Sequence, residues 1–117
     1  MKPAPVKPLI TVDDLEKIDI RVGTILALEE VAGSRKLMKL TVDCGDHNRT
    51  VLAGIRQERD DPQALVGVQA LFVVNLAPRE MAGERSEGML FDIGYADRQT
   101  PVLAVPENPI ANGSRAG

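Results

Sequence analysis

A strict alternation of apolar and polar residues constrains the fold of this chain more than any other feature. In segment 38–44 the even-numbered residues are Met, Leu, Val and Cys, and the odd-numbered ones are Lys, Thr and Asp. Successive side chains of a β-strand point to opposite faces of its sheet, so this pattern predicts a strand with one buried face. Segment 18–23 alternates in the same way. Both segments therefore favour a β-sheet packed on one core.

Turn residues divide the rest of the chain into further strands. Residues 45–48 predict the turn of a hairpin, and Thr11 and Pro62 predict the starts of short helices at 12–17 and 63–66. Five main strands with one short helix between the third and the fourth predict an all-β, five-stranded OB-fold Greek-key barrel with short flanking helices. The predicted strands are 18–28, with a bulge or bend at Gly23, then 38–44, 49–55, 68–76 and 88–95, and a short extra strand at 101–105.

Three segments are predicted to lie outside these strands. Residues 78–86 predict a polar loop, residues 110–117 a tail, and residues 1–10, with three prolines, an extended arm. A chain of 117 residues suits one domain, which buries roughly two-thirds of the surface that its unfolded chain exposes. We therefore expect an arm at 1–10 and a single OB-fold domain at 11–117.

Charge and aromatic content narrow the function. Fourteen Lys and Arg against seventeen Asp and Glu give a net charge of −3, which argues against a polyanion binder held by overall charge. Only the middle third, residues 31–60, is net positive, with six basic and four acidic residues. The chain has two Phe, one Tyr and no Trp, too few to stack successive unpaired bases.

The sequence also indicates a compartment. A single cysteine, Cys44, excludes an intrachain disulfide and a structural zinc site of the multi-cysteine kind. The longest apolar runs, such as 70–74, span a few residues, against the ~20 that cross a bilayer. The first residues lack the apolar segment of a secretory signal. We therefore expect a cytoplasmic protein without a membrane span.

Five short motifs carry a family resemblance. They are Ile-Asp-Ile-Arg-Val-Gly at 18–23, Arg-Lys-Leu-Met-Lys-Leu at 35–40, Val-Leu-Ala-Gly-Ile at 51–55, Val-Asn-Leu-Ala-Pro-Arg at 74–79 and Ser-Glu-Gly-Met-Leu at 86–90. In this order and spacing they closely resemble the tRNA-binding domain family. That family includes free-standing dimeric tRNA-binding proteins, the C-terminal domain of many methionyl-tRNA synthetases and export chaperones of the CsaA type. The resemblance covers about residues 12–115.

The resemblance implies two groups of RNA-binding residues. One group lies at the entry to the second predicted strand, where basic side chains can contact phosphates. The alternative for that group is a solvated strand end. The other group matches positions that the family implicates in tRNA contact. The expected RNA-binding residues are Arg35, Lys36 and Lys39 in the first group, and Asn75, Arg79, Ser86 and Met89 in the second.

Three residues near the second group allow other interpretations. The Ser86 hydroxyl and the Glu87 carboxylate can instead satisfy backbone N–H groups of the tight loop before the fifth strand. Glu80 departs from the family pattern, because family members often carry a second basic residue there. An acid beside Arg79 offsets part of its field, so Glu80 is expected to lower the affinity for RNA.

A metal or catalytic site is not expected. Asp43, Cys44, Asp46 and His47 are the only cluster of metal-ligand types, but Cys44 falls on the core side of its strand and Asp43 on the other. Cys44 and His47 likewise face opposite sides, which disfavours a nucleophile and its base. We expect no cofactor.

The resemblance implies a non-catalytic homodimer that recognises the shape of folded tRNA through backbone and sugar contacts. The N-terminal helix around Leu15 and the segment after Tyr95 would build the dimer interface. The alternative is a protein-interaction module, either a CsaA-type export chaperone for unfolded preprotein or a scaffold partner of an aminoacyl-tRNA synthetase. The motifs at 51–55 and 86–89 favour the tRNA-binding branch, whereas the acidic balance and Glu80 favour a protein ligand.

Overall fold

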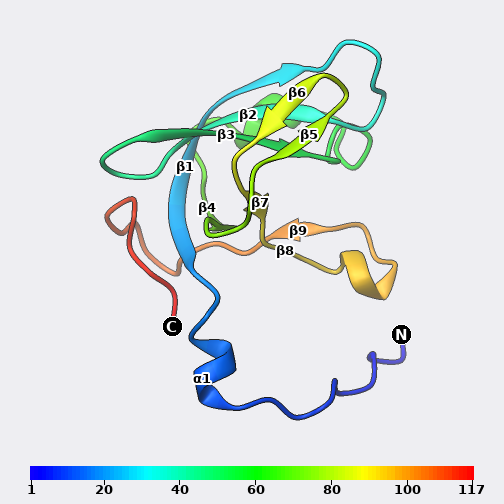
Figure 1. Cartoon of the computed structure of the whole chain (residues 1–117). Coiled ribbons are helices and arrows are strands. Elements are labelled where there is room, and N and C mark those ends of the chain that lie inside the picture. The colour runs from blue at the N-terminus through cyan, green and yellow to red at the C-terminus, as the bar shows by residue number, and fades with distance from the viewer.

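A curled, five-stranded antiparallel sheet forms the centre of the molecule (Figure 1). The computed structural model describes all 117 residues. Strand β1 (Ile20–Glu30) bends, so that its first half pairs with β4 (Gln69–Val73) and its second half with β2 (Met38–Asp43). Strands β3 (Asn48–Ala53) and β7 (Met89–Leu90) complete the order β3-β2-β1-β4-β7. The prediction of an all-β OB-fold barrel is confirmed.

Segment 38–44 buries the face that its pattern predicts, whereas in segment 18–23 Ile18 is 48% exposed and Val22, although buried, lies outside the core cluster. Met38, Leu40, Val42 and Cys44 are 7% exposed or less, and together with the central Phe72 they belong to one core cluster. The opposite faces of these strands carry the polar residues, which remain half-buried or exposed. In segment 38–44 the period-two pattern therefore sets the inside and the outside of the barrel.

The bend in β1 lies further along the strand than predicted. The register with β2 shifts between Ile25 and Ala27, which marks a bulge there rather than at Gly23. Gly23 has a different role, because a Cβ at this position would lie 2.5 Å from Val42 Cγ1 and 3.3 Å from Phe72 Cδ2. The glycine lets β1 approach the core side chains of its neighbouring strands closely.

The predicted loop at 78–86 is a hairpin. Strands β5 (Arg79–Met81) and β6 (Glu84–Ser86) pair, and Ala82 and Gly83 between them both have positive φ, at 50° and 79°. Two residues with positive φ match the right-handed twist of a tight hairpin, and the glycine makes that geometry accessible. Because the segment is polar, its composition indicated a loop and did not indicate this strand pair.

The predicted strand at 88–95 is interrupted. Strand β7 ends at Leu90, and β8 (Asp92–Ile93) leaves the main sheet to pair with β9 (Val102–Leu103), which falls inside the predicted strand at 101–105. The Phe91 N–H still donates to the Leu71 carbonyl, at 2.9 Å. The chain therefore turns off β4 after Phe91, just before the polar Asp92.

The end of the predicted C-terminal tail bonds to the edge of the sheet through an isolated bridge between Arg21 and Arg115. Residues 113–116 run along the start of β1, where the Gly113 N–H donates to the Val22 carbonyl and the Ala116 N–H to the Ile20 carbonyl. Pairing of β1 with β2 begins only at Thr24. The first residues of β1 therefore have a free edge, and the C-terminal segment satisfies it.

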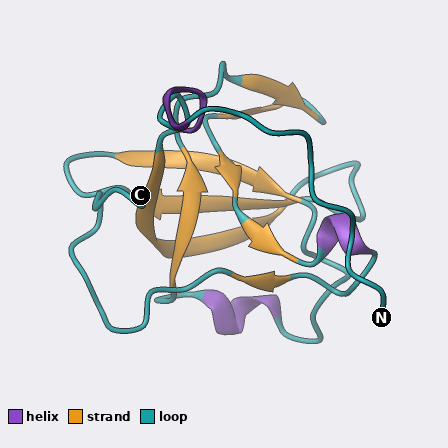
Figure 2. Cartoon of the chain, turned by 90° about the horizontal axis from the view of Figure 1, so that it is seen from below, coloured by secondary structure: helices purple, strands orange, loops and turns teal.

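The helices are short and lie outside the curled sheet (Figure 2). Helix α1 (Val12–Leu15) starts at the predicted cap, since the Thr11 hydroxyl accepts from the Asp14 N–H at 3.1 Å, and it ends before the predicted residue 17. The helix predicted at 63–66 is the 3-10 turn η1 (Pro62–Leu65), and a second turn, η2 (Tyr95–Asp97), precedes β9. None of these helices is long and apolar enough to cross a membrane.

Candidate nucleic-acid interface

Two loops place four basic side chains around the outer face of β2 and β3. Arg35 and Lys36 lie in the loop between β1 and β2, and Arg79 and Arg85 lie on the β5–β6 hairpin, which connects β4 to β7. All four are exposed, and none of their side chains forms an ion pair or a hydrogen bond within the chain. We call these four residues the basic face. In OB folds this strand surface and these two loops form the binding side for oligonucleotides.

Most cations elsewhere have partners. Ion pairs join Arg21 to Asp19 at 2.6 Å and Arg56 to Glu30 at 2.9 Å. Their positive charges are therefore offset locally, and a ligand would have to compete for them. The cations without a partner outside the basic face are Lys2 and Lys7 in the arm and Arg98 at the end of η2.

Lys39 occupies an intermediate position. Its ammonium group lies 3.5 Å from the Glu84 carboxylate of the hairpin, and both side chains are partly exposed, at 32% and 41%. Ion pairs with this exposure contribute little, typically 0–1 kcal/mol. Lys39 therefore lies beside the basic face with a carboxylate that a phosphate can replace.

Glu80 does not lie on the same side of the hairpin as Arg79. In the register of β5 and β6, Glu80 is directly opposite Arg85, whereas Arg79 is opposite Ser86. Neighbouring residues of a strand point to opposite faces, so Glu80 opposes the field of Arg85 more than that of Arg79. This differs from the sequence expectation, which placed Glu80 beside Arg79.

Ser86 and Glu87 join the end of the hairpin to the edge of β3. The Ser86 hydroxyl accepts from the Leu52 N–H at 3.0 Å and donates to the Gly88 carbonyl at 2.9 Å. The Glu87 carboxylate accepts from the Thr50 N–H at 3.0 Å, and the Glu87 N–H donates to the Thr50 carbonyl at 2.8 Å. These side chains satisfy backbone N–H groups, as the second interpretation of the sequence held, but the groups belong to β3 rather than to their own loop. We call this contact the closing seam of the barrel.

Asn75 has a similar connecting role. Its side-chain oxygen accepts from the Asp19 N–H at 2.9 Å, and its amide nitrogen donates to the Lys17 carbonyl at 2.7 Å. Both bonds tie the end of β4 to the segment between α1 and β1. The Asn75 side chain is therefore already committed at both its oxygen and its nitrogen, although the residue is exposed.

Three of the seven expected residues share one cavity. Arg79, Ser86 and Met89 line a space of about 130 Å³ between β3 and the hairpin. Leu52, on the outer face of β3, lines the same cavity and is 5% exposed. Arg35, Lys36, Lys39 and Asn75 do not line it.

A comparison with known protein families identifies the part of the chain that forms the sheet and the basic face. The family model of the tRNA binding domain covers residues 20–115, which include all five strands of the sheet and both loops of the basic face. The chain belongs to the tRNA-binding domain family. Residues 1–19, with the arm and α1, lie outside the match.

Solved structures similar to this tRNA-binding domain come from two kinds of protein. A MetRS-related protein from Pyrococcus horikoshii is 32% identical, with a TM-score of 0.86 over 95% of this chain and all of that one. The CsaA chaperone from Bacillus anthracis is 28% identical, with a TM-score of 0.82 over 94% of this chain and all of that one. The CsaA chaperone from Picrophilus torridus is 27% identical, with a TM-score of 0.81 over 93% and 100% of the two chains.

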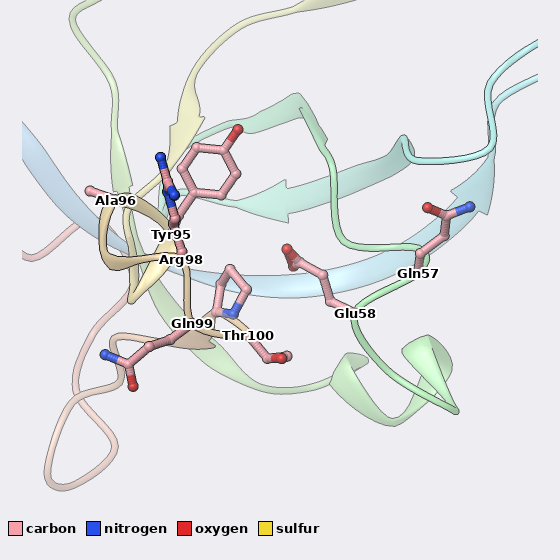
Figure 3. A pocket seen from close by; sticks show the side chains of 8 residues that line it. Gln57, Glu58, Tyr95, Ala96, Arg98, Gln99 and Thr100 are labelled. Carbon is pink, nitrogen blue, oxygen red and sulfur yellow. The ribbon is translucent and has the colours of Figure 1, made fainter. Parts of the chain in front are cut away.

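A wide cavity of this tRNA-binding domain lies away from the basic face. It has a volume of about 690 Å³, and Figure 3 shows Tyr95 and Arg98 on its η2 side and Gln57 and Glu58 on the other. Burial raises the pKa of the Glu58 carboxyl. None of the seven expected residues lines this cavity. A carboxylate in its wall opposes a polyanion, so its size does not make it the RNA site.

The cluster at the β2–β3 turn does not converge. Cys44 is buried with the core, and burial raises the pKa of its thiol. The His47 ring instead contacts the Asp46 carboxylate at 2.6 Å and accepts from the Arg49 guanidinium at 2.9 Å. No group of three or more His, Cys, Asp or Glu side chains is placed to hold a metal ion.

Sequence reasoning missed two features of the candidate site in this tRNA-binding domain. Arg85 belongs to the basic face, and Met81 lines the small cavity beside Arg79. The position of Met81 follows from the hairpin, which places residues two apart on the same face, whereas Arg85 is opposite Glu80 and lies on the other face of the hairpin. The Ala-Gly pair at 82–83 is the signal that could have revealed it.

Proposed function

We propose that this protein binds folded tRNA as a homodimer and catalyses no reaction. The observation that carries the proposal is the placement of four unpaired cations in two loops at the binding side of an OB fold. The net charge of the chain is −3, so attraction for RNA has to be local. The basic face supplies that local positive charge. Phosphate contacts of this kind position a protein on nucleic acid without reading its sequence.

Seven residues form the proposed RNA-binding site, with different roles. Arg35, Lys36, Arg79 and, after release from Glu84, Lys39 contact phosphates. Asn75 and Ser86 act by holding the loop between β4 and β7 in place, since their side chains are already bonded to backbone groups. Met89, 47% exposed, presents an apolar side chain at the edge of the small cavity.

The ligand we propose is folded RNA rather than an extended single strand. The only aromatic side chains are Phe72, Phe91 and Tyr95, and Phe72 is in the core. A single-strand binder stacks successive bases on aromatic rings, and the outer face of β2 and β3 carries none. Recognition of folded RNA relies on its shape and on backbone and sugar contacts.

The second copy of the chain would cover the surface built by the two chain ends. In the arm, Val6 and Leu9 are 95% and 97% exposed. Five of the apolar residues exposed near α1, β8 and β9 are Leu15, Ile93, Tyr95, Val102 and Val105, which we call the chain-end surface. Figure 1 shows the arm and α1 at the bottom of the molecule and the β5–β6 hairpin at the top. Exposed apolar surface gathered in one region marks an interaction site, and a symmetric dimer would leave both basic faces free for one RNA.

The proposed arrangement of the chain is an arm at 1–10 and one domain at 11–117. We place the protein in the cytoplasm, where tRNA and the aminoacyl-tRNA synthetases that use it are found. A synthetase partner is consistent with the MetRS-related structure, which matches over the whole of its own length.

A second candidate function is favoured by the two CsaA structures. Both align over their full length with this chain, at TM-scores of 0.82 and 0.81. Under this alternative the protein is a chaperone that binds unfolded preprotein. The acidic net charge and Glu80 support it, because they weaken attraction for RNA.

The test is an electrophoretic mobility shift with total tRNA at two salt concentrations. We expect tRNA to bind more tightly than a single-stranded poly-pyrimidine RNA of equal length, and the affinity to fall as salt rises. An unfolded peptide should not displace the tRNA. Equal or tighter binding of the single strand, or ready displacement by the peptide, contradicts the proposal and favours an ordinary single-strand surface or a chaperone, respectively.

A further inference from the structure

The small cavity between β3 and the β5–β6 hairpin has room for one planar group. Its volume of about 130 Å³ equals the space of about four water molecules at roughly 30 Å³ each. Pockets for drug-sized ligands measure about 300–1,000 Å³. The cavity can therefore receive a single ring or side chain, and it is too small for a whole nucleotide or an organic cofactor.

The walls of the cavity are suited to the faces of a ring rather than to its edge. Leu52, Leu76, Met81 and Met89 line it, and methionine thioethers make favourable contacts with aromatic rings. The hydroxyl of Ser86, which also lines the cavity, is already bonded to the Leu52 N–H and the Gly88 carbonyl. Apart from the Arg79 guanidinium, no lining side chain offers an unsatisfied donor that demands a particular partner, so any ring of suitable size is accepted.

The charge around the cavity distinguishes between possible occupants. Arg79 lines it without an ion-pair partner, Lys39 pairs with Glu84 of the hairpin at 3.5 Å, and Arg85 lies on the hairpin face opposite to Arg79. A guanidinium stacks on base planes and binds phosphate, and every RNA base is linked to a phosphate. An apolar peptide side chain would fit the space but would gain nothing from these cations.

We propose that this cavity receives one unstacked base of the bound RNA, while Arg79 contacts the phosphate attached to it; this inference rests on the proposed function. A single base needs one cavity and does not need several aromatic side chains for stacking. This agrees with the scarcity of aromatic residues. The preferred ligands are then folded RNAs that carry at least one base outside the stack. Paired stems bind through the basic face alone.

The experiment compares two RNA stems of equal charge, one fully paired and one with a single bulged 2-aminopurine. The variant Ala77→Leu fills the cavity from an exposed lining residue without changing charge. The matched control is Ala64→Leu, at an exposed alanine of η1. Circular dichroism melts of both variants check that the fold is kept, and binding of total tRNA by the parent protein tests the proposed function separately.

We expect the parent protein to bind the bulged stem about five- to tenfold more tightly than the paired one, near the low end for one stacked base. Ala77→Leu should abolish this preference and the 2-aminopurine fluorescence change, and leave the paired stem and the salt dependence unaltered. Ala64→Leu should retain the preference. If total tRNA binds but Ala77→Leu keeps the preference, the inference is overturned and the proposed function stands. If an unfolded peptide binds the parent but not Ala77→Leu, the cavity belongs to a protein ligand.

Discussion

The basic face and the chain-end surface differ in how the fold treats their side chains. Around β2 and β3, cations project from two loops without partners, above a strand edge whose backbone groups are satisfied by Ser86 and Glu87. At the two chain ends, apolar side chains such as Ile93 and Val102 are more than half exposed. Unpaired charge at a surface suits a polyanion, whereas exposed apolar surface suits another protein. The proposed function assigns the first surface to RNA and the second to another copy of the chain.

This separation can be tested with one substitution made at two sites. Val102→Asp places a carboxylate within the chain-end surface, and Val66→Asp makes the same change at a valine of similar exposure after η1. We expect Val102→Asp to give monomers of 12.6 kDa by light scattering and to weaken tRNA binding about 100-fold, since two linked faces bind far more tightly than one. Val66→Asp should change neither.

A mass near 12.6 kDa for the parent protein at micromolar concentration would contradict the dimer outright. A stable interface should bury ~1,200 Å² or more in total.

Loss of a contact in the closing seam is expected to lower the stability of the fold and to leave the electrostatic part of RNA binding unchanged. Ser86→Ala leaves the buried Leu52 N–H without its acceptor, which should lower the free energy of unfolding by about 1–3 kcal/mol. Urea denaturation measures this, and Ser34→Ala is the control, because Ser34 caps a Leu37 N–H in a more accessible loop. The salt dependence of tRNA binding by the folded variant should be unchanged. A loss of salt dependence with full stability would assign Ser86 to the ligand instead.

Removing a single cation of the basic face should weaken RNA binding and leave the stability of the fold unchanged. Arg79→Ala and Lys36→Ala should each weaken tRNA binding by ~1 kcal/mol and flatten the log-log salt dependence by about one unit. Arg98→Ala, at an exposed cation of η2, should do neither. All three positions are exposed, so thermal melts should remain within a few degrees of the parent. If only Arg98→Ala alters binding, the RNA lies at the other end of the barrel.

Glu80→Lys should have a smaller effect in the other direction. The substitution removes the carboxylate opposite Arg85 and adds a cation at the hairpin. We expect tighter tRNA binding and a steeper salt dependence, measured in the same titrations. An unchanged affinity would mean that the outward face of the hairpin does not approach the RNA.

The smallest expected effect is on the pH dependence of stability, and it comes from Glu58 in the wall of the cavity of about 690 Å³. Burial raises the pKa of Glu58 above its ordinary value of 4.5, so ionisation of this carboxyl costs stability in the folded protein. This cost is absent below pH 4.5, where Glu58 is protonated in both states, and grows as the pH rises through the folded pKa. The unfolding free energy of Glu58→Gln, relative to the parent, should therefore rise between pH 4 and pH 7. Parallel pH profiles would show that Glu58 is effectively solvated.

The sequence indicated the main strands because their alternation is a local property. Segment 38–44 buries its even-numbered residues for the same steric reason that any half-buried strand does. The family motifs also indicated which loops carry the cations. The residues without such a pattern, the hairpin at 79–86 and the C-terminal residues 113–116, were predicted as a loop and a tail.

The tertiary structure alone decided what those segments do, because their partners are remote in the chain. Residues 113–116 pair with β1 because β1 begins before β2 can cover its edge. Ser86 bonds to Leu52, 34 residues away, because the barrel brings the end of the hairpin against β3. A local pattern shows which side of a strand is apolar, but an unsatisfied N–H becomes visible only when all the strands are in place.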